Sequence, residues 1–251
     1  VGRQWRALQD TANDPIISQR QPKGWLSWQR DEDYYSEGQL IWLDVDTLIR
    51  ERTNGRKSLD DFARAFFGVE DGDYTPAPYT FEDVVRTLNG VVPYDWADFL
   101  RTRLDGHGPG APLDGLARGG YRLVYAETPS DWQKTLYGEY KRNDFTYSLG
   151  IQTGEGNVIR SVQWNSPAFQ AGLATGMEIV AVNGRAASPS AISEAITAAK
   201  DPNTAVELIL KDADRYRTVR IDYHDGLRYP RLERIAGTPD RLGDILTPRR
   251  R

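Results

Sequence analysis

The chain has 251 residues, of which 39% are hydrophobic and 27% are charged, and its formal net charge at pH 7 is -4. Its 32 basic residues are scattered among 36 acidic ones, so no basic face favours binding to nucleic acid. No apolar run approaches the ~20 residues of a membrane span. The absence of cysteine excludes disulfides, thiol nucleophiles and cysteine metal ligands, but it leaves the cellular compartment open.

The beginning of the chain, residues 1–30, is polar, irregular and rich in tryptophan, and Pro15 and Pro22 break any long element there. We expect an ordered loop region that leans on another surface. The chain starts at Val1 with neither a methionine nor a signal region, which indicates a piece of a longer product.

A helical unit is predicted between residues 31 and 105. From 31 to 53 apolar residues recur at helical spacing, and Gly55 ends the pattern. Two shorter helices follow, and a fourth is expected over residues 94–104. The two shorter helices have start signals in which a carboxylate can answer the capping hydroxyl: Ser58-x-x-Asp61 and Thr80-x-x-Asp83.

The next segment, residues 107–112, has too much glycine and proline for regular structure. A hairpin is predicted after it, with a first strand from Tyr121 to Tyr125 and a return that reaches Tyr140. We place a domain boundary near Arg142.

Residues 165–184 read as a helix, a turn, a strand and a hairpin in close succession. Ser166 and Pro167 can cap and start a short helix, which Gly172 then ends. Gly176 turns the chain into an apolar strand, and Asn183-Gly184 is a two-residue hairpin signal. Beyond it we expect a helix capped by Ser188, strands over 205–210 and 218–223 joined by a turn at 212–215, and a tail from Asp225 without periodicity.

This order of Ser-Pro-Ala, Ala-Gly-Leu, Gly-x-x-Ile and Val-Asn-Gly closely resembles the signature of a PDZ domain, although Met177 stands where the pattern usually has aspartate. The expected fold is α+β. An N-terminal helical unit with a linking hairpin fills residues 1–142, a PDZ-like β-barrel or sandwich with helices fills 143–225, and a tail fills 226–251.

The PDZ resemblance implies a peptide-binding groove. The segment Tyr147-Ser148-Leu149-Gly150-Ile151 looks like a carboxylate-binding loop and the strand that it opens, so the amides of Leu149, Gly150 and Ile151 would bind the terminal carboxylate of a peptide or protein C-terminus that adds to the sheet edge. The helix after Ser188 would form the opposite wall with Ile192 and Ile196. The alternative is that this apolar face is core, which we prefer for Ile196, whereas Ile192 is the better groove candidate.

The first half carries a second resemblance. Residues 33–50 and 57–62, continued by 78–84 and 93–96, look like the C-terminal half of the catalytic region of bacterial glycyl aminopeptidases, zinc peptidases of the gluzincin type that carry a C-terminal PDZ domain. The family would hold zinc with H-E-x-x-H and a later glutamate. This chain has no such motif, so it should bind no zinc and be inactive alone. Its two histidines, His107 and His224, are expected to be structural or exposed.

One catalytic role carries over by resemblance. Tyr35-Ser36-Glu37-Gly38 matches a Tyr-x-x-Gly pattern whose tyrosine hydroxyl donates a hydrogen bond to the oxyanion of the tetrahedral intermediate. The alternative is that Tyr34 and Tyr35 only anchor the start of a helix. Asp44 and Asp46 are not expected to act as a pair, because residues two apart on a helix point to different sides, and Asp46 is expected to pair with Arg50.

Two functions follow from these patterns. The first is the C-terminal part of a zinc aminopeptidase that releases glycine or alanine from the N-terminus of peptides, with its zinc ligands on an upstream catalytic segment of the same polypeptide. The second is a non-catalytic PDZ adaptor that binds peptides. The resemblance associates the first with the bacterial periplasm or cell envelope.

Overall fold

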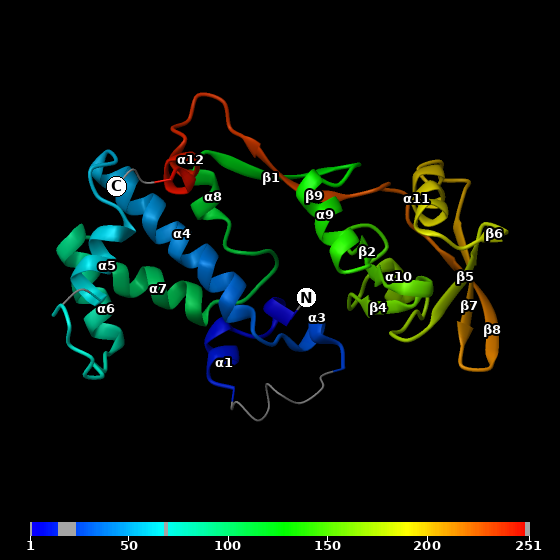
Figure 1. Cartoon of the computed structure of the whole chain (residues 1–251), viewed down its shortest axis with the longest axis horizontal. Helices are drawn as coiled ribbons and strands as arrows, with labels where there is room; N and C mark the ends of the chain where they lie inside the picture. Colours follow the sequence, from blue (N-terminus) through cyan, green and yellow to red (C-terminus); the bar gives the residue numbers. More distant parts are fainter. Residues whose placement is uncertain (1, 15–23, 68–69, 249–251) are drawn as a thin grey trace. The chain divides into compact units, whose positions relative to one another are not determined.

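The computed structural model describes residues 2–14, 24–67 and 70–248, and its fold is α+β (Figure 1). The chain forms two compact units. The helical unit contains residues 2–14, Arg30–Arg122 and residues 233–248, and the sheet unit contains residues 24–29 and Leu123–Leu232. These ranges differ from the division expected at residue 142. Residues 123–142 belong to the sheet unit, and each unit also contains a segment from the other end of the chain.

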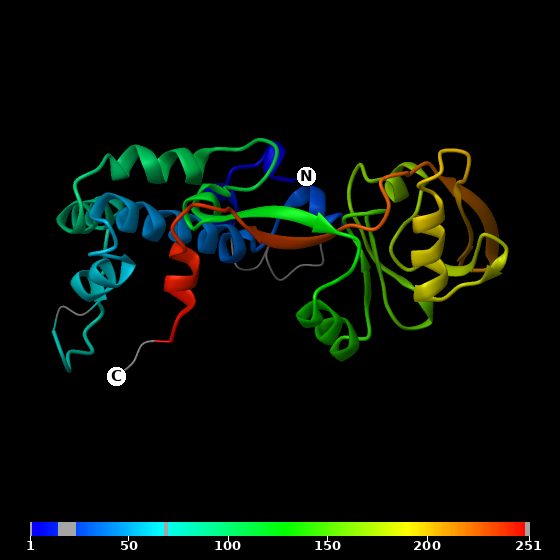
Figure 2. The ribbon, with the colours of Figure 1, turned by 90° about the horizontal axis from the view of Figure 1, so that it is seen from above.

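The helical unit is built around α4, a helix of 21 residues (Figure 1, Figure 2). Helices α1, α5, α8 and α12 contact α4, whereas α6 packs on α5 and α7. A buried cluster that includes Val45, Ile49, Leu88 and Trp96 forms the core. The elements are η1 (Gly2–Gln4), α1 (Leu8–Ala12), α4 (Asp33–Thr53), α5 (Leu59–Phe67), α6 (Phe81–Val91), α7 (Trp96–Asp105), α8 (Asp114–Arg118) and α12 (Arg241–Leu246).

The capping signals of the helical unit are confirmed. The hydroxyl of Thr80 accepts a hydrogen bond from the Asp83 amide at 3.2 Å, and the Asp83 carboxylate accepts one from the Thr80 amide at 2.8 Å. This capping box starts α6, and the hydrogen bond from the Thr80 amide is the main reason why the pKa of Asp83 is lowered. Helix α4 ends as expected just before Gly55: its last residue is Thr53, and Asn54 has the left-handed conformation (φ 51°).

A buried carboxylate joins α4 to α7 and α8. Asp44 is fully buried, and its Oδ2 lies 2.6 Å from Nη2 of Arg103, while the guanidinium of Arg118 pairs with its other oxygen. Helix α8 approaches α4 closely at Gly115, where an added Cβ would lie 2.6 Å from the Asp44 amide nitrogen. Asp44 is therefore a structural link between three helices.

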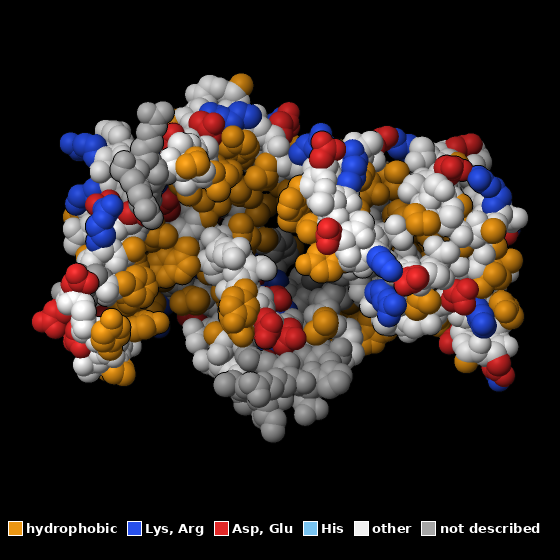
Figure 3. Space-filling view, in the orientation of Figure 1, with side chains coloured by type: hydrophobic (Ala, Val, Ile, Leu, Met, Phe, Trp, Pro, Cys, Tyr) orange, Lys and Arg blue, Asp and Glu red, His pale blue; other side chains and the backbone are white. Residues whose placement is uncertain are grey.

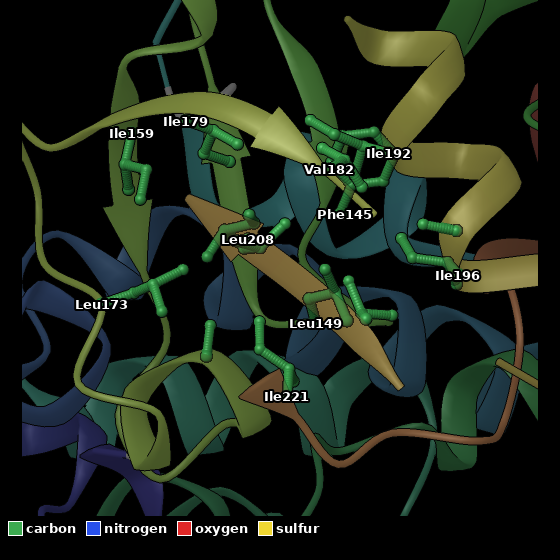
Figure 4. Close-up of a cluster of buried hydrophobic side chains, with 14 of the residues drawn as sticks. Phe145, Leu149, Ile159, Leu173, Ile179, Val182, Ile192, Ile196, Leu208 and Ile221 are labelled. Carbon is green, nitrogen blue, oxygen red and sulfur yellow. The ribbon is translucent and has the colours of Figure 1, made fainter. Parts of the chain in front are cut away.

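The sheet unit contains two small antiparallel sheets, with strand orders β2-β3-β4 and β6-β5-β7-β8. Helix α11 contacts β5, and the buried side chains of both sheets form one cluster (Figure 4). Strands β1 (Tyr121–Ala126) and β9 (Tyr229–Arg234) pair with each other and lie where the chain enters and leaves this unit. The other elements are α3 (Leu26–Gln29), α9 (Asp131–Glu139), β2 (Asn143–Phe145), β3 (Ile151–Thr153), η2 (Glu155–Asn157), β4 (Ile159–Val162), α10 (Pro167–Gln170), β5 (Glu178–Val182), β6 (Arg185–Ala186), α11 (Pro189–Ala198), β7 (Val206–Asp212) and β8 (Arg215–Ile221).

The local signals of the PDZ-like segment are confirmed. Ser166 caps α10 by accepting from the Phe169 amide, and Ser188 caps α11 in the same way. Asn183 and Gly184 both have positive φ (47° and 75°), as a type I′ turn requires, and they join β5 to β6.

Residues 24–29 of the tryptophan-rich segment belong to the sheet unit and pack against residues distant in sequence, which agrees with the expectation of a region that leans on another surface. The rings of Trp25 and Trp28 lie 5.4 Å and 5.7 Å from the ring of Trp164, and the Trp164 amide donates to the hydroxyl of Ser27 at 2.9 Å. The segment is less irregular than expected, because residues 26–29 form α3. Pro15 and Pro22 lie outside the described residues.

One sequence prediction is wrong. The hairpin expected over residues 121–140 does not form, because residues 131–139 make helix α9, which starts with a capping box between Ser130 and Gln133. Strand β1 instead pairs with β9, which lies in the tail from Asp225, whose sequence has no periodicity. The start of α9 has a local signal, the Ser130-x-x-Gln133 pattern. The pairing of β1 with β9 has none, because β9 is charged, contains Pro230 and is distant from β1 in sequence.

We expect Asp44→Asn to lower the free energy of unfolding of the helical unit by about 3 kcal/mol, because it leaves two guanidinium groups without their carboxylate. The value is at the lower end of the usual range because both arginine side chains keep some contact with water. Denaturation followed by far-UV circular dichroism measures the change. Asp105→Asn, at the end of α7, is the matched control and should change the stability little; equal effects of both variants would contradict the structural role of Asp44.

Candidate functional sites

Tyr35 lies in the first turns of α4, and its side chain is 64% exposed. The neighbouring ring of Tyr34 is partly buried, lies 4.7 Å from the Tyr35 ring and packs on the core of the helical unit. Burial is the main reason why the pKa of Tyr34 is raised. Anchoring of the helix start is therefore the role of Tyr34, whereas the hydroxyl of Tyr35 is open to an approaching group.

The glycine of the Tyr-x-x-Gly pattern leaves space beside Tyr35. Gly38 lies three residues further along α4, so the two residues share one face of the helix. An added Cβ at Gly38 would meet no atom within 4 Å, so this face is not filled by the rest of the described helical unit.

A buried ion-pair network fixes the start of α4. Arg30 is 2% exposed and has a left-handed backbone (φ 60°); its Nη2 lies 2.5 Å from the Glu37 carboxylate and its Nε lies 2.7 Å from that of Asp33. Arg3 reaches the other oxygen of Glu37 at 2.9 Å. Since Glu37 is two residues after Tyr35, this network sets the orientation of the helix turn that carries Tyr35.

The acidic residues in the middle of α4 do not form an acid/base pair, as expected. Asp46 accepts from Nε of Arg50 at 3.1 Å, which confirms that pairing, and it also accepts from the amide of Leu59 at 2.7 Å. Asp44 is engaged on the opposite side with Arg103 and Arg118. Both carboxylates are thus used for structure.

The described residues contain no group of three or more His, Cys, Asp or Glu side chains that could hold a metal ion. His107 is exposed in the loop before α8, and His224 lies after β8 with its Nε2 2.8 Å from Asp222. This donor set does not fit a zinc site. Within the same described ranges, no helix is both long enough and apolar enough to cross a membrane.

The residues of the expected carboxylate-binding loop lie together between β2 and β3. Leu149 and Ile151 are fully buried, and Gly150 has a positive φ of 85°. The Gly150 amide, expected to bind a ligand, donates to the backbone carbonyl of Phe145 at 2.9 Å, and the Ser148 amide donates to the same oxygen at 3.1 Å. Of the three amides expected to bind a carboxylate, that of Gly150 donates to this oxygen, together with the amide of Ser148, so the chain itself supplies an acceptor at the loop.

The two isoleucines expected to line the groove are both fully buried in α11. Ile192 and Ile196 belong to the same cluster as Leu149 and Phe145 (Figure 4). Phe145 was not singled out from the sequence; the only signal for it is that an apolar residue directly precedes the polar start of the loop. All four side chains are buried together, so both isoleucines are part of the core, and the apolar face of α11 that carries them is covered by this chain.

The fold has relatives among solved structures. An aminopeptidase N family protein from Idiomarina loihiensis is similar over 88% of this chain, with 19% identity and a TM-score of 0.54, and the match covers 38% of the length of that protein. The HtrA3 PDZ domain, solved with a phage-derived ligand, matches 45% of this chain at 19% identity and covers 91% of that domain, with a TM-score of 0.24. The first match supports the fold of the chain, and the second is too weak to support an argument. No protein family model and no curated protein matches the sequence.

Gly150→Ala is expected to destabilise the sheet unit by about 2–5 kcal/mol, since a Cβ there would lie 2.1 Å from Cβ of Ser166 and would add overpacking to the strain of a positive φ. Gly176→Ala is the matched control: its φ is 92°, but no atom lies within 4 Å of the new Cβ, so only about 1 kcal/mol is expected. Thermal unfolding of both variants measures the difference, and equal losses would contradict the close packing of the loop.

The C-terminal end of α11 forms a hydrogen bond with the side chain of His224. Nδ1 of His224 lies 2.6 Å from the carbonyl oxygen of Ala199, and Nε2 lies 2.8 Å from Asp222. The hydrogen bond to Ala199 is the main reason why the pKa of His224 is raised, and Asp222 and Asp201 add to the shift. A protonated imidazole at a helix C-terminus is stabilised by the helix dipole.

Because the pKa of His224 is higher in the folded state than the ordinary value of about 6.5, its stabilising contribution is complete below pH 6.5 and is lost as the pH rises through the folded value. We therefore expect the melting temperature of the native chain to fall relative to that of His224→Gln as the pH is raised from about 6 to 8. His107→Gln, which changes the exposed histidine, should follow the native profile. Parallel profiles for all three proteins would contradict the assignment.

Proposed function

We propose that this chain is the distal part of a zinc-dependent aminopeptidase that releases small N-terminal residues, glycine or alanine, from peptides. In this proposal the helical unit forms one wall of the active site, Tyr35 donates a hydrogen bond to the oxyanion, and the sheet unit is a PDZ module that binds peptides or protein C-termini. The similarity in fold to an aminopeptidase N family protein supports the class, and the resemblance to glycyl aminopeptidases supports the substrate.

The observation that carries the proposal is the exposure of the Tyr35 side chain. A tyrosine that only anchors a helix is buried, but Tyr35 is 64% exposed while Tyr34 does the packing. The buried Arg30–Glu37 pair holds the helix turn that carries Tyr35, which supports a fixed position of its backbone in the proposed site. Pre-oriented donors of this kind stabilise a developing oxyanion because they need no reorganisation during the reaction.

Zinc enters the proposal only through an upstream segment. In the proposal, the metal is held by residues of an upstream catalytic segment of the same polypeptide, as the resemblance to glycyl aminopeptidases implies. A bound zinc would supply an activated water and polarise the substrate carbonyl.

The surface of the helical unit is consistent with such a neighbour. Hydrophobic side chains form patches on it (Figure 3). Large exposed apolar groups mark surfaces that bind other protein segments when they lie close together. The aromatic residues that are at least one third exposed on α4, on α5 and in the loop before α6 are Tyr35, Trp42, Phe67, Tyr74 and Tyr79.

In the full-length enzyme, Tyr35→Phe is expected to lower kcat by about 10²–10³ with little change in KM, because only the transition state loses a hydrogen bond. Release of a fluorophore from glycyl and alanyl substrates measures both constants. Tyr216→Phe, which changes a tyrosine of similar exposure (63%) on β8, is the matched control and should retain nearly full activity.

Sequencing the natural polypeptide upstream of Val1 tests the proposal itself. An H-E-x-x-H helix followed by a glutamate is the expected finding, together with inactivity of the isolated 251-residue chain. A natural protein that begins near Val1 would contradict the enzyme and leave the second candidate, a PDZ adaptor that binds peptides without catalysis.

A further inference from the structure

Strand β3 is paired along both of its edges by strands of this chain. Strand β4 lies on one edge, and β2 lies antiparallel on the other, with Phe145 opposite Ile151 and Asn143 opposite Thr153. A peptide bound by β-augmentation adds to a sheet edge that has no partner strand. The edge that follows the carboxylate-binding loop is therefore already filled, by residues 143–145.

Strand β2 uses the two features that would bind the last residue of a peptide. The side chain of Phe145 is 3% exposed and lies in the cluster of Leu149, Ile192 and Ile196 (Figure 4). Its carbonyl oxygen accepts hydrogen bonds from the amides of Ser148 and Gly150. An aromatic side chain in the apolar pocket and an oxygen at the loop amides are what a C-terminal phenylalanine would supply.

The other end of β2 leads into an open cleft. A cavity of about 390 Å³ is lined by Asn143, by Gly154 after β3 and by Pro189, the first residue of α11. Strand β2 thus runs from the start of α11 to the loop, which is the course of a ligand strand between a sheet edge and a helix.

We propose that β2 is a built-in substitute for a ligand, and that the groove accepts an extended peptide with a C-terminal aromatic residue when β2 leaves. The inference rests on the peptide-binding role proposed for the sheet unit. Residues 146–150 tether β2 to β3. A short tether gives an effective concentration on the order of millimolar or more, so a free peptide binds with an affinity reduced by the small fraction of open molecules.

The test uses the full 251-residue chain and a fluorescent hexapeptide with the sequence of residues 140–145 and a free C-terminal carboxylate. Phe145→Ala removes the anchor of β2 and leaves the loop and α11 unchanged. We expect this variant to bind the peptide at least about tenfold more tightly than the native chain, measured by fluorescence anisotropy. The same peptide with a C-terminal amide, or with alanine as its last residue, should lose this gain.

A reversible lock provides the matched control. Asp144 and Gln152 are opposite each other, and their side chains are joined by a hydrogen bond of 3.1 Å, so Asp144→Cys and Gln152→Cys place two thiols in contact across β2 and β3. The chain has no other cysteine. In the Phe145→Ala background, oxidation should abolish the gain in peptide binding, and reduction should restore it.

Three results would overturn the proposal: equal binding by native and Phe145→Ala chains, binding that survives oxidation of the lock, or no binding by a folded variant. If Phe145→Ala does not fold, Phe145→Leu takes its place and should show the same effects with a smaller gain. None of these results touches the kinetics of Tyr35→Phe, so a failure here is distinguishable from a failure of the proposed aminopeptidase.

Discussion

Arginine–carboxylate pairs along α4 fix the segments that pack against this helix in the helical unit. Glu37 is paired with Arg30 and Arg3, and Asp44 is paired with Arg103 and Arg118. These partners come from segments far apart in sequence, so each pair fixes a different piece of chain against the same helix. Buried ion pairs contribute little net stability, because desolvation offsets much of their attraction, but a broken pair is expensive. These pairs therefore determine which segments pack against α4. The pairs of Glu37 also fix the helix turn that carries Tyr35.

In the sheet unit, the hydrogen-bonding groups along the edge of β3 are paired by another strand of the same chain. An edge strand exposes amides and carbonyls that pair readily with other chains, and proteins usually cover or blunt such edges. Here β2 covers β3, and Phe145 secures it by burial in the common core. The same arrangement that protects the edge also removes the site at which a PDZ-like module would take a ligand. Strand β2 can therefore either protect the edge of β3 or leave that edge free for a ligand, but it cannot do both.

The sequence was most informative where structure is local. Capping residues such as Thr80 and Ser166, the Asn183–Gly184 turn and the period of α4 all form what their patterns predict, because each depends on neighbours within a few positions. Pairing of β1 with β9 joins residues more than a hundred positions apart, and no local pattern encodes it. The candidate sites divide in the same way. The loop around Gly150 follows from its motif, whereas the burial of Phe145 depends on α11, which is distant in sequence. The partners of Arg30 are close in sequence, but no motif links Arg30 to Glu37.

The tether between β2 and β3 bears on which ligands the sheet unit selects. A free peptide must compete with a strand held by only five connecting residues, which keeps the strand at high local concentration. A segment that is itself held nearby, either within the same polypeptide or on a bound partner, gains a comparable local concentration and competes on equal terms. Closure by β2 therefore favours tethered segments over free peptides. In the proposed peptide-binding function, this closure distinguishes a segment that is already held nearby from a free peptide, whereas an open groove of the same affinity does not.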